Sequence, residues 1–329
     1  MRMQVLQQFH SALMKRAFHK IKRVVFGNDA TLIHQNQYPL NVSKGNNVSI
    51  HPSAILLCPL NGKIYFEGNN YVGRNVEMGP LHLISLGAST SIQDRCILLG
   101  DIEIGRYCLF APNVYMSSGR HYYNLKPEFY IKDQDEMVVA DATLSKQHSK
   151  KITIEDDCWI GINVVVMSGV IIGKGSVIAA NAVITKNVEP YSIMAGAPAT
   201  LVKKRLLFEP KDSIDYLNDA DLPYFYSGFY TDLKSLNQFR KLGGIKMMDS
   251  FSVCINSKNK TIILLSIKND SASVLKINYH HQTKELKPNL VSTIDFDINS
   301  EMVHKFTVSE NQKDMPNAKS VLIQSVKTI

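Results

Sequence analysis

One histidine, His121, follows the segment APNVYMSSGR, at the point where a regular pattern of apolar residues stops. An imidazole can take a proton from a hydroxyl group near neutral pH, so this side chain is a candidate general base. A single histidine in a loop is otherwise a solvated surface residue, and we interpret the other nine histidines in that way. His82 and His148 are the alternatives to His121 as the base.

Three cations stand near the end of the patterned region, Lys186, Lys203 and Arg205. Because phosphate groups attract cations, these side chains are candidates for binding a phosphorylated molecule. For Lys203 and Arg205, the alternative is that they only solvate the end of the folded core. The single tryptophan, Trp159, precedes an apolar position of the pattern, so we expect it to point outward, either to line a site or to cover a neighbouring subunit.

The pattern that positions these residues is an apolar residue at every sixth position. It runs through Leu86, Ile92, Leu98, Ile104, Phe110 and Met116, and again through Ile154, Ile160, Val166, Ile172, Ile178, Ile184 and Pro190. A helix would repeat at about 3.6 residues and a single strand at about two. A period of six is typical of a parallel β-helix, in which three short strands and their turns make one triangular coil. Buried strands of an α/β sheet would not keep this phase.

Small residues accompany the apolar positions in a regular way. Three of the five cysteines, Cys96, Cys108 and Cys158, stand four residues after an apolar position, and glycine often follows that position directly. We predict that the thiols pack in the corners of the coil and that glycine permits the bend between faces. The cysteines show neither a metal-binding nor a disulfide pattern, which predicts no metal site and a reducing compartment.

The pattern is interrupted between Met116 and Ile154, which are 38 positions apart instead of six. We therefore predict that residues 117–151 form a loop that leaves the coil, with His121 at its root. A projecting loop can supply one wall of a pocket that a smooth coil lacks. The acids of this loop are candidates for orienting His121, and the spacing does not choose between them. They are Asp133, Asp135 and Glu136.

We expect three regions in the chain. Residues 1–26 hold six Lys and Arg and no acid, and they predict an amphipathic helix. We favour packing of this helix on the coil or on a partner subunit, and the alternative is peripheral association with an anionic membrane. Residues 27–205 are the β-helix domain. In residues 206–329, a short helix at 232–244 and six short strands predict a small β-sandwich.

Composition and charge exclude several protein classes. The hydrophobic content of 45% is ordinary for a globular protein, and no apolar run is long enough to span a membrane. The start of the chain lacks the pattern of a signal peptide. Outside residues 1–26 the chain is nearly neutral, so we predict that the protein does not bind nucleic acid. We expect it in the cytoplasm, with the inner face of the membrane as an alternative.

The hexapeptide-repeat acyltransferases resemble this chain in two segments, IGRYCLFAPNVYMSSGRH (104–121) and ITIEDDCWIGINVVVMSGVIIGKGSVIAANAVITKNVEPYSIMAGAPATLVKKR (152–205). The resemblance is to the branch of galactoside, maltose and xenobiotic acetyltransferases, and it covers about residues 50–205. It implies a left-handed parallel β-helix and a homotrimer that holds acyl-coenzyme A between neighbouring subunits.

The same resemblance implies roles for individual residues. His121 takes the place of the catalytic base, and Trp159 takes the place of a tryptophan that lines the active site. Ala180, Lys186 and Lys203 match positions that contact coenzyme A. Ile162 departs from the pattern, because a small residue is often found there.

The resemblance implies an O-acetyltransferase that uses acetyl-coenzyme A and acts on a saccharide. We expect a surface polysaccharide, such as capsule or O-antigen, because the added β domain and the basic helix fit a large acceptor made at the membrane. The alternatives are an acetyltransferase for a small molecule or xenobiotic, a zinc lyase on the same fold, and a non-catalytic trimeric scaffold that binds glycans. Zinc is disfavoured because His121 has no histidine within five residues, and the intact motifs disfavour the scaffold.

Overall fold

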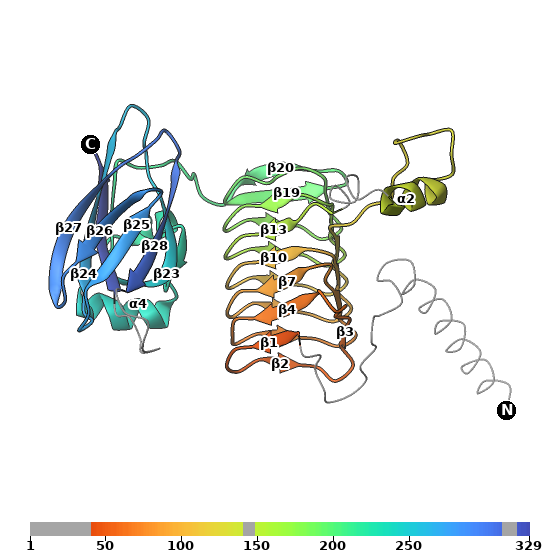
Figure 1. The fold of residues 1–329 in the computed structure, drawn as a ribbon, viewed down its shortest axis with the longest axis horizontal. Coiled ribbons are helices and arrows are strands. Elements are labelled where there is room, and N and C mark those ends of the chain that lie inside the picture. Colours follow the sequence, from red (N-terminus) through yellow and green to blue (C-terminus); the bar gives the residue numbers. More distant parts are fainter. Residues whose placement is uncertain (1–40, 141–148, 311–320) are drawn as a thin grey trace. The chain divides into compact units, whose positions relative to one another are not determined.

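The computed structural model describes residues 41–140, 149–310 and 321–329. The chain divides into two compact units between Leu207 and Phe208, whereas the expected domain boundary followed residue 205 (Figure 1). The predicted helix at 1–26 and the alternative base His148 lie outside the described residues.

Three parallel sheets form the walls of the first unit (Figure 1). Wall A consists of β1 (Val42–Lys44), β4 (Lys63–Phe66), β7 (Leu83–Leu86), β10 (Ile102–Ile104), β13 (Ile152–Ile154) and β16 (Ile171–Ile172). Wall B consists of β2 (Ser49–Ile50), β5 (Tyr71–Val72), β8 (Ser91–Ile92), β11 (Leu109–Phe110), β14 (Trp159–Ile160), β17 (Val177–Ile178), β19 (Ser192–Gly196) and the antiparallel β20 (Ala199–Lys204). Wall C consists of β3 (Ile55–Leu56), β6 (Glu77–Gly79), β9 (Ile97–Leu99), β12 (Tyr115–Ser117), β15 (Val165–Val166) and β18 (Val183–Ile184). The chain visits the walls in the order A, B, C, so the predicted parallel β-solenoid is confirmed.

The apolar positions of the repeat fill the interior of this solenoid. In wall A, Leu86 pairs with Ile104, and Ile104 pairs with Ile154 across the long interruption. These three side chains are at most 2% exposed. Burial of each such side chain contributes about 1.5–3 kcal/mol relative to leaving it in water. The coil therefore resumes in register after the loop, because the same interior column must be continued.

The glycines that follow the apolar positions serve a different purpose from the one predicted. A Cβ on Gly105 would lie 2.6 Å from the backbone nitrogen of Asp156, and one on Gly161 would lie 2.7 Å from that of Ala180. Neither glycine has a positive φ, which occurs instead two residues later, at Tyr107 and Asn163. The expectation that glycine permits the bend was wrong. Glycine is needed because neighbouring coils, about 4.8 Å apart, leave no room for a side chain there.

Departures from the six-residue step occur at one corner of the triangle. The steps from wall A to wall B and from wall B to wall C keep the period, as from Phe66 to Val72 and on to Met78. The step from wall C back to wall A is longer in three coils, and the interruption at 117–151 is the longest. This turn, the C–A corner, comprises residues 57–62, 80–82, 100–101, 118–151, 167–170 and those directly after Ile184. Inserted chain is therefore gathered along one edge of the solenoid.

The second unit is built from antiparallel strands. They are β21 (Ser213–Asp215), β22 (Ser227–Phe229), β23 (Ile245–Cys254), β24 (Ile262–Asn269), β25 (Leu275–Tyr279), β26 (Gln282–Leu286), β27 (Leu290–Asp297), β28 (Val303–Glu310) and β29 (Val321–Thr328). Short helices connect the first of them, namely η1 (Asp219–Tyr224), α4 (Leu233–Phe239) and η2 (Arg240–Leu242). Asp232 is the N-cap of α4, because its carboxylate accepts a hydrogen bond from the Ser235 N–H at 3.0 Å.

The long strand β23 passes from one sheet of this unit to the other. Its first residues pair with β29 and its last five pair with β28. The two sheets enclose a core of aromatic rings, in which Phe251 stacks on Phe306 with ring centroids 5.2 Å apart. The aromatic residues Tyr224, Phe225, Tyr226 and Phe229 are buried in the same core rather than offered to a sugar. The predicted sandwich-like second domain is therefore confirmed as an antiparallel sheet domain.

Candidate functional site

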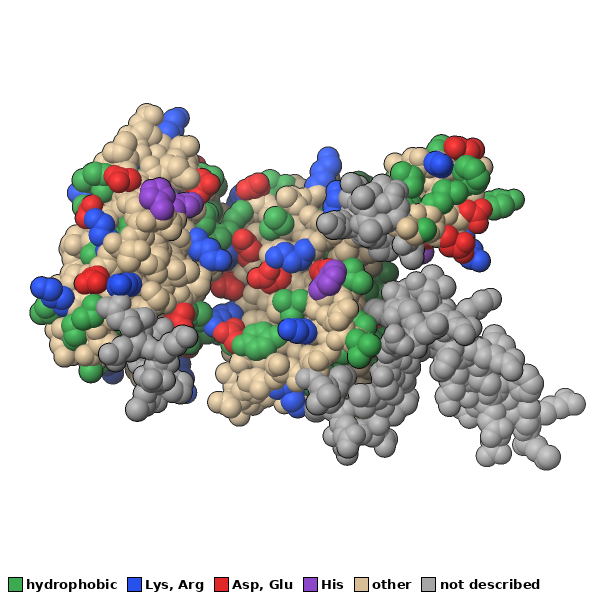
Figure 2. All heavy atoms as spheres, viewed as in Figure 1, with side chains coloured by type: hydrophobic (Ala, Val, Ile, Leu, Met, Phe, Trp, Pro, Cys, Tyr) green, Lys and Arg blue, Asp and Glu red, His purple; other side chains and the backbone are tan. Residues whose placement is uncertain are grey.

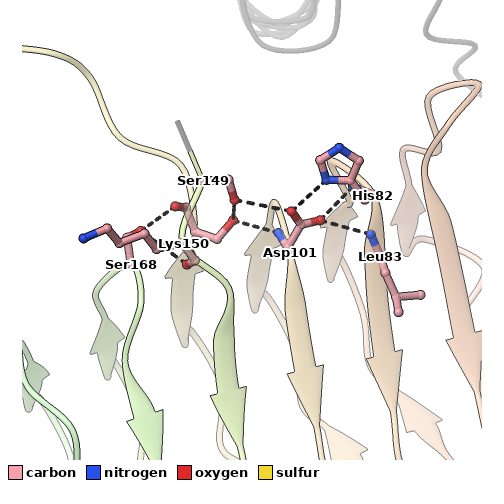
Figure 3. Close-up of polar contacts among 7 residues, drawn as sticks. His82, Leu83, Asp101, Ser149, Lys150 and Ser168 are labelled. Carbon is pink, nitrogen blue, oxygen red and sulfur yellow. Dashed lines mark hydrogen bonds and ion pairs between the residues drawn. The ribbon is translucent and has the colours of Figure 1, made fainter. Parts of the chain in front are cut away.

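A buried serine clamps the root of the loop to the coil beside it (Figure 3). Ser118, which follows β12, is fully buried, and its Oγ accepts a hydrogen bond from the Asp101 N–H at 2.7 Å. Its Oγ also lies 2.5 Å from the Ser149 Oγ, and its carbonyl accepts from the Lys150 N–H at 3.1 Å. The chain therefore leaves and re-enters the C–A corner at a defined point, three residues before His121.

The alternative base His82 belongs to the same corner, two coils away from Ser118, and Asp101 lies in the coil between them. Its Nδ1 lies 2.9 Å from Asp101 Oδ2, and Asp101 Oδ1 accepts hydrogen bonds from the N–H groups of His82 and Leu83 (Figure 3). Burial alone would raise the pKa of Asp101, but these hydrogen bonds hold it below its ordinary value. The Asp101 carboxylate thus serves to close the turn between β6 and β7.

His121 forms a second histidine–carboxylate pair, on the loop itself. Its Nδ1 lies 2.6 Å from Asp135 Oδ2, and the side chain of His121 is 74% exposed. The other carboxylate oxygen of Asp135 accepts a hydrogen bond from the Tyr122 N–H at 2.8 Å. Sequence spacing left three loop acids open, and the structure brings Asp135 to the imidazole.

Asp135 is carried by a helix that the sequence analysis did not predict, α2 (Ile131–Ala140), seen beside the solenoid in Figure 1. The neighbouring Gln134 is buried, and its Oε1 accepts hydrogen bonds from the N–H groups of Leu125 and Lys126 at 3.0 Å. Its Nε2 donates to the carbonyl of Phe129 at 3.0 Å. One glutamine thereby ties α2 to the segment that follows His121.

Trp159 lies on the outside of wall B, as predicted. Its side chain is 55% exposed, whereas the next residue, Ile160, is fully buried. Leu109 and Val177 are its register partners on the outer face of the wall. His121 belongs to the C–A corner and Trp159 to wall B, so one chain does not bring these two side chains to the same face.

The residues expected to contact a cofactor are spread over the last coils. Lys186 is exposed at the C–A corner, the corner that also carries His121. Ala180 is exposed in the turn that follows β17 of wall B. Lys203 is exposed on β20, where it pairs with Ile193 of β19. All of these backbone or side-chain groups are open to solvent in the single chain.

Arg205 differs from the other candidates because it has a partner in its own chain. Its Nη1 lies 2.8 Å from Asp157 Oδ2 and donates to the carbonyl of Gly175 at 3.1 Å. Both members of the ion pair are about half exposed, so the pair contributes little to stability. A phosphate would have to compete with Asp157 for this guanidinium.

The five cysteines are free and buried, as predicted. Burial raises the pKa of Cys58 and of Cys96 to about 11, and contact with Cys108 together with burial raises that of Cys158. A thiol with such a pKa is a poor nucleophile near neutral pH. Among the residues that the structure describes, no group of three or more His, Cys, Asp or Glu is placed to hold a metal ion.

On the face seen in Figure 2, the described residues show no uniform field of charge. There, lysine and arginine side chains are interspersed with aspartate and glutamate. Within residues 41–140, 149–310 and 321–329, none of the helices has the length and hydrophobicity needed to cross a bilayer.

Comparison with known proteins identifies a family model that matches part of the six-residue repeat. Residues 151–186 match the family model described as bacterial transferase hexapeptide (six repeats). Residues 151–186 therefore carry the repeat of this family model. The resemblance inferred from the sequence is thereby confirmed, and the matched residues are the strands and turns from wall A through the last coil of this hexapeptide-repeat solenoid.

Curated relatives match parts of this hexapeptide-repeat chain. A probable macrolide acetyltransferase of Lysinibacillus sphaericus is 60% identical over 52 residues, or 16% of this chain and 29% of the relative. A galactoside O-acetyltransferase of Lactococcus lactis subsp. lactis is 27% identical over 164 residues, or 50% of this chain and 64% of the relative. The chain thus spans less than two thirds of the length of these relatives. Among solved structures, a variant of AntD, an N-acyltransferase from Bacillus cereus in complex with dTDP and coenzyme A, has a TM-score of 0.41 and 17% identity, and the match covers 50% of this chain and 84% of that one.

Proposed function

We propose that this protein is an O-acetyltransferase that moves an acetyl group from acetyl-coenzyme A to a hydroxyl group of a saccharide. The observation that carries this proposal is His121, whose imidazole is paired at Nδ1 with Asp135 and exposed at the root of a loop in a hexapeptide-repeat solenoid. The names of the relatives support it, since they are acetyltransferases for a galactoside, a macrolide and chloramphenicol.

In the proposed reaction, His121 acts as the general base. Its Nε2 takes the proton from the acceptor hydroxyl while the hydroxyl oxygen forms a bond to the acetyl carbon. The bond between that carbon and the sulfur of coenzyme A breaks, and the departing thiolate receives the proton from the imidazolium. No covalent enzyme intermediate is needed, and the five cysteines, buried with raised pKa values where a shift is resolved, offer no nucleophile for one.

The proposed site lies between two copies of the chain, within a homotrimer. His121 and Lys186 lie on the C–A corner, whereas Trp159 and Ala180 lie on wall B or beside it. One copy would supply the base and the neighbouring copy would supply Trp159 along the thioester. The pantetheine amides would pair with backbone groups near Ala180, where the side chain is small.

The phosphates of acetyl-coenzyme A would be held by cations of the last coils. Lys186 and Lys203 are exposed and suit this role. Arg205 would join them only by exchanging Asp157 for a phosphate oxygen. We therefore expect the affinity for acetyl-coenzyme A to depend more on Lys186 and Lys203 than on Arg205.

We propose a surface polysaccharide, of the capsule or O-antigen kind, as the acceptor, modified in the cytoplasm at the inner face of the membrane. The antiparallel second unit and the basic segment at 1–26 fit a large acceptor made there. A small-molecule acceptor is the second candidate, because a segment of 52 residues is 60% identical to a probable macrolide acetyltransferase. A non-catalytic trimeric scaffold that binds glycans would leave the His121–Asp135 pair without a purpose.

Acetyl transfer by the full chain tests the proposal. Labelled acetyl-coenzyme A is supplied with oligosaccharides, polysaccharides, a macrolide and chloramphenicol, and products are read by mass spectrometry. His121→Ala should lower turnover by about 10²- to 10⁴-fold and retain coenzyme A binding, because a base contributes that much. His82→Ala is the matched control, as its ring is equally exposed and also paired with an aspartate. Failure of the wild-type chain to bind acetyl-coenzyme A or to acetylate any acceptor would contradict the proposal.

A further inference from the structure

We propose that Asp135 is a positioning residue, which fixes the tautomer and the direction of the His121 ring, and that α2 serves to deliver this carboxylate. The inference rests on the proposed function, because it assigns a role to Asp135 at the same site. Its starting point is the distance of 2.6 Å between His121 Nδ1 and Asp135 Oδ2. A separation this short is typical of a charge-assisted hydrogen bond.

The contact determines which ring nitrogen is free to act. An ionised carboxylate can only accept hydrogen bonds, so the proton of a neutral His121 ring must reside on Nδ1. The lone pair is then on Nε2, the nitrogen that points away from Asp135 and takes the hydroxyl proton in the proposed reaction. When Nε2 becomes protonated, the positive charge of the imidazolium is stabilised by the adjacent carboxylate.

Asp135 holds the backbone as well as the ring. Its Oδ1 accepts the hydrogen bond from the Tyr122 N–H at 2.8 Å while Oδ2 contacts the His121 ring. The same carboxylate therefore fixes two consecutive residues relative to α2. A ring that is 74% exposed would otherwise sample several rotamers, each at little cost.

The helix that carries Asp135 is anchored close to this contact. Gln134 forms three hydrogen bonds to the segment 125–129, and Val138, one turn further along α2, is 1% exposed. The ring of Tyr122 is also buried, at 6% exposure, and the Arg120 guanidinium lies 5.3 Å from its centroid. The position of the carboxylate is thus set by packing within the loop and not by the exposed ion pair alone.

The replacement Asp135→Asn distinguishes the effect of Asp135 on the His121 ring from its effect on the Tyr122 backbone. Asparagine keeps one oxygen for the Tyr122 N–H but presents an amide N–H to His121 Nδ1, which must then accept it. The ring would carry its proton on Nε2 and could no longer act as a base. We expect kcat to fall by about 10²- to 10⁴-fold while KM for acetyl-coenzyme A stays within about twofold. Asp135→Glu should recover part of kcat.

Two neighbouring replacements provide controls. Glu136→Gln lies on the same helix, and its partner is Lys132 at 3.8 Å, so this variant should keep wild-type kcat. Asp133→Asn removes another acid from the first turn of α2 and should do the same. Equal loss of kcat in all three variants, or wild-type kcat in Asp135→Asn, would overturn the positioning role.

A spectroscopic readout tests the inference without any acceptor. Nitrogen-15 NMR of the ring nitrogens, assigned by comparison with His121→Ala, should show the Nδ1–H tautomer for His121 in the wild-type chain and the Nε2–H tautomer in Asp135→Asn. His82, paired with Asp101, should not change. The Nε2–H tautomer in the wild-type chain would refute the inference. Because this readout needs no turnover, it remains decisive even if the proposed acetyl transfer fails.

Discussion

Two histidine–aspartate pairs lie on the described part of the C–A corner, and they are held in different ways. The Asp101 carboxylate accepts backbone N–H groups of the turn and meets the hydroxyl of Ser149, so the His82 ring is one of several partners that close a coil. The Asp135 carboxylate is brought to His121 by a helix inserted into the repeat. At the scale of the residue, a histidine–aspartate contact therefore does not by itself indicate a catalytic role. The two pairs differ in the element that carries the carboxylate, which is a turn of the repeat for Asp101 and an inserted helix for Asp135.

The cysteines allow a prediction at the same scale. Thiolates react with disulfide reagents, and burial raises the pKa of Cys58 and Cys96 to about 11. We expect no reaction of the folded chain with Ellman's reagent at pH 8 within minutes, and reaction of all five thiols in guanidinium chloride. The measurement is absorbance of the released thiolate with time. Prompt labelling of the native chain at one or more thiols would contradict the buried placement.

At the scale of the element, the period of six predicted the coil well because its cause is steric and repeated. An apolar side chain at each interior position is the condition for stacking, so Leu86 and Ile104, three steps of six apart, are expected on one wall from the sequence alone. The structure adds Ile154 to that wall. Helix α2 could not be found in this way. Helix α2 is held by the side-chain amide of Gln134 and by Val138. Two buried side chains are too few to produce a recognisable hydrophobic period in the sequence.

The choice among the three loop acids shows the same limit. Asp133, Asp135 and Glu136 are equivalent in the sequence, since each stands within the interruption and none marks a repeat. Which carboxylate faces His121 depends on the rotation of α2 about its axis, and that rotation is set by the burial of Gln134 and Val138. Sequence reasoning therefore named a candidate base, His121, but not the carboxylate that lies beside it.

The root of the loop gives a prediction about an element. Ser118→Ala removes the acceptor of the partly buried Asp101 N–H and the contact to Ser149, and the net contribution of such a hydrogen bond is about 0.5–1.5 kcal/mol. We expect a lower free energy of unfolding of the first unit, by that amount, in urea titrations followed by circular dichroism.

The neighbouring Ser117→Ala serves as the control for this measurement. Ser117 is partly exposed at the end of β12, and the change should shift the free energy of unfolding by less than about 0.5 kcal/mol. Ser118→Ala should also slow turnover, because His121 follows the clamp by three residues. Equal stability of the two variants would show that the clamp contributes nothing measurable.

At the scale of the whole molecule, the proposed site cannot be completed by one chain. The sequence assigned both His121 and Trp159 to it, but the coil places the first at the C–A corner and the second on wall B. Spacing along a repeat gives the position of a residue within its coil, whereas the pairing of one face with another depends on how copies assemble. The assembly of copies into the proposed homotrimer is therefore the part of the proposed function that the spacing of the repeat does not predict.

The second unit should respond to acid through one buried histidine. The interpretation of His304 as a solvated surface residue was wrong, because this side chain is fully buried. Its Nδ1 lies 2.9 Å from the Tyr279 hydroxyl and its Nε2 lies 3.2 Å from the Ser257 hydroxyl. Burial lowers the pKa of His304, and the nearby charge of Glu301 only partly opposes this. The neutral ring is thus favoured in the folded state. Its contribution to stability is complete above the unfolded pKa of about 6.5 and is lost as the pH falls through that value toward the lower folded pKa.

Calorimetry of the full chain between pH 7.5 and pH 5 measures this effect. The transition of the second unit should move to lower temperature over this window, and His304→Gln, which keeps polar groups but cannot titrate, should reduce the slope even if it starts from a lower melting temperature. His281→Gln, on the exposed hairpin between β25 and β26, is the matched control and should leave the slope unchanged. The lowered pKa would be wrong if His304→Gln and wild type lost stability in parallel as the pH fell, because the buried imidazole would then bind no additional proton on unfolding.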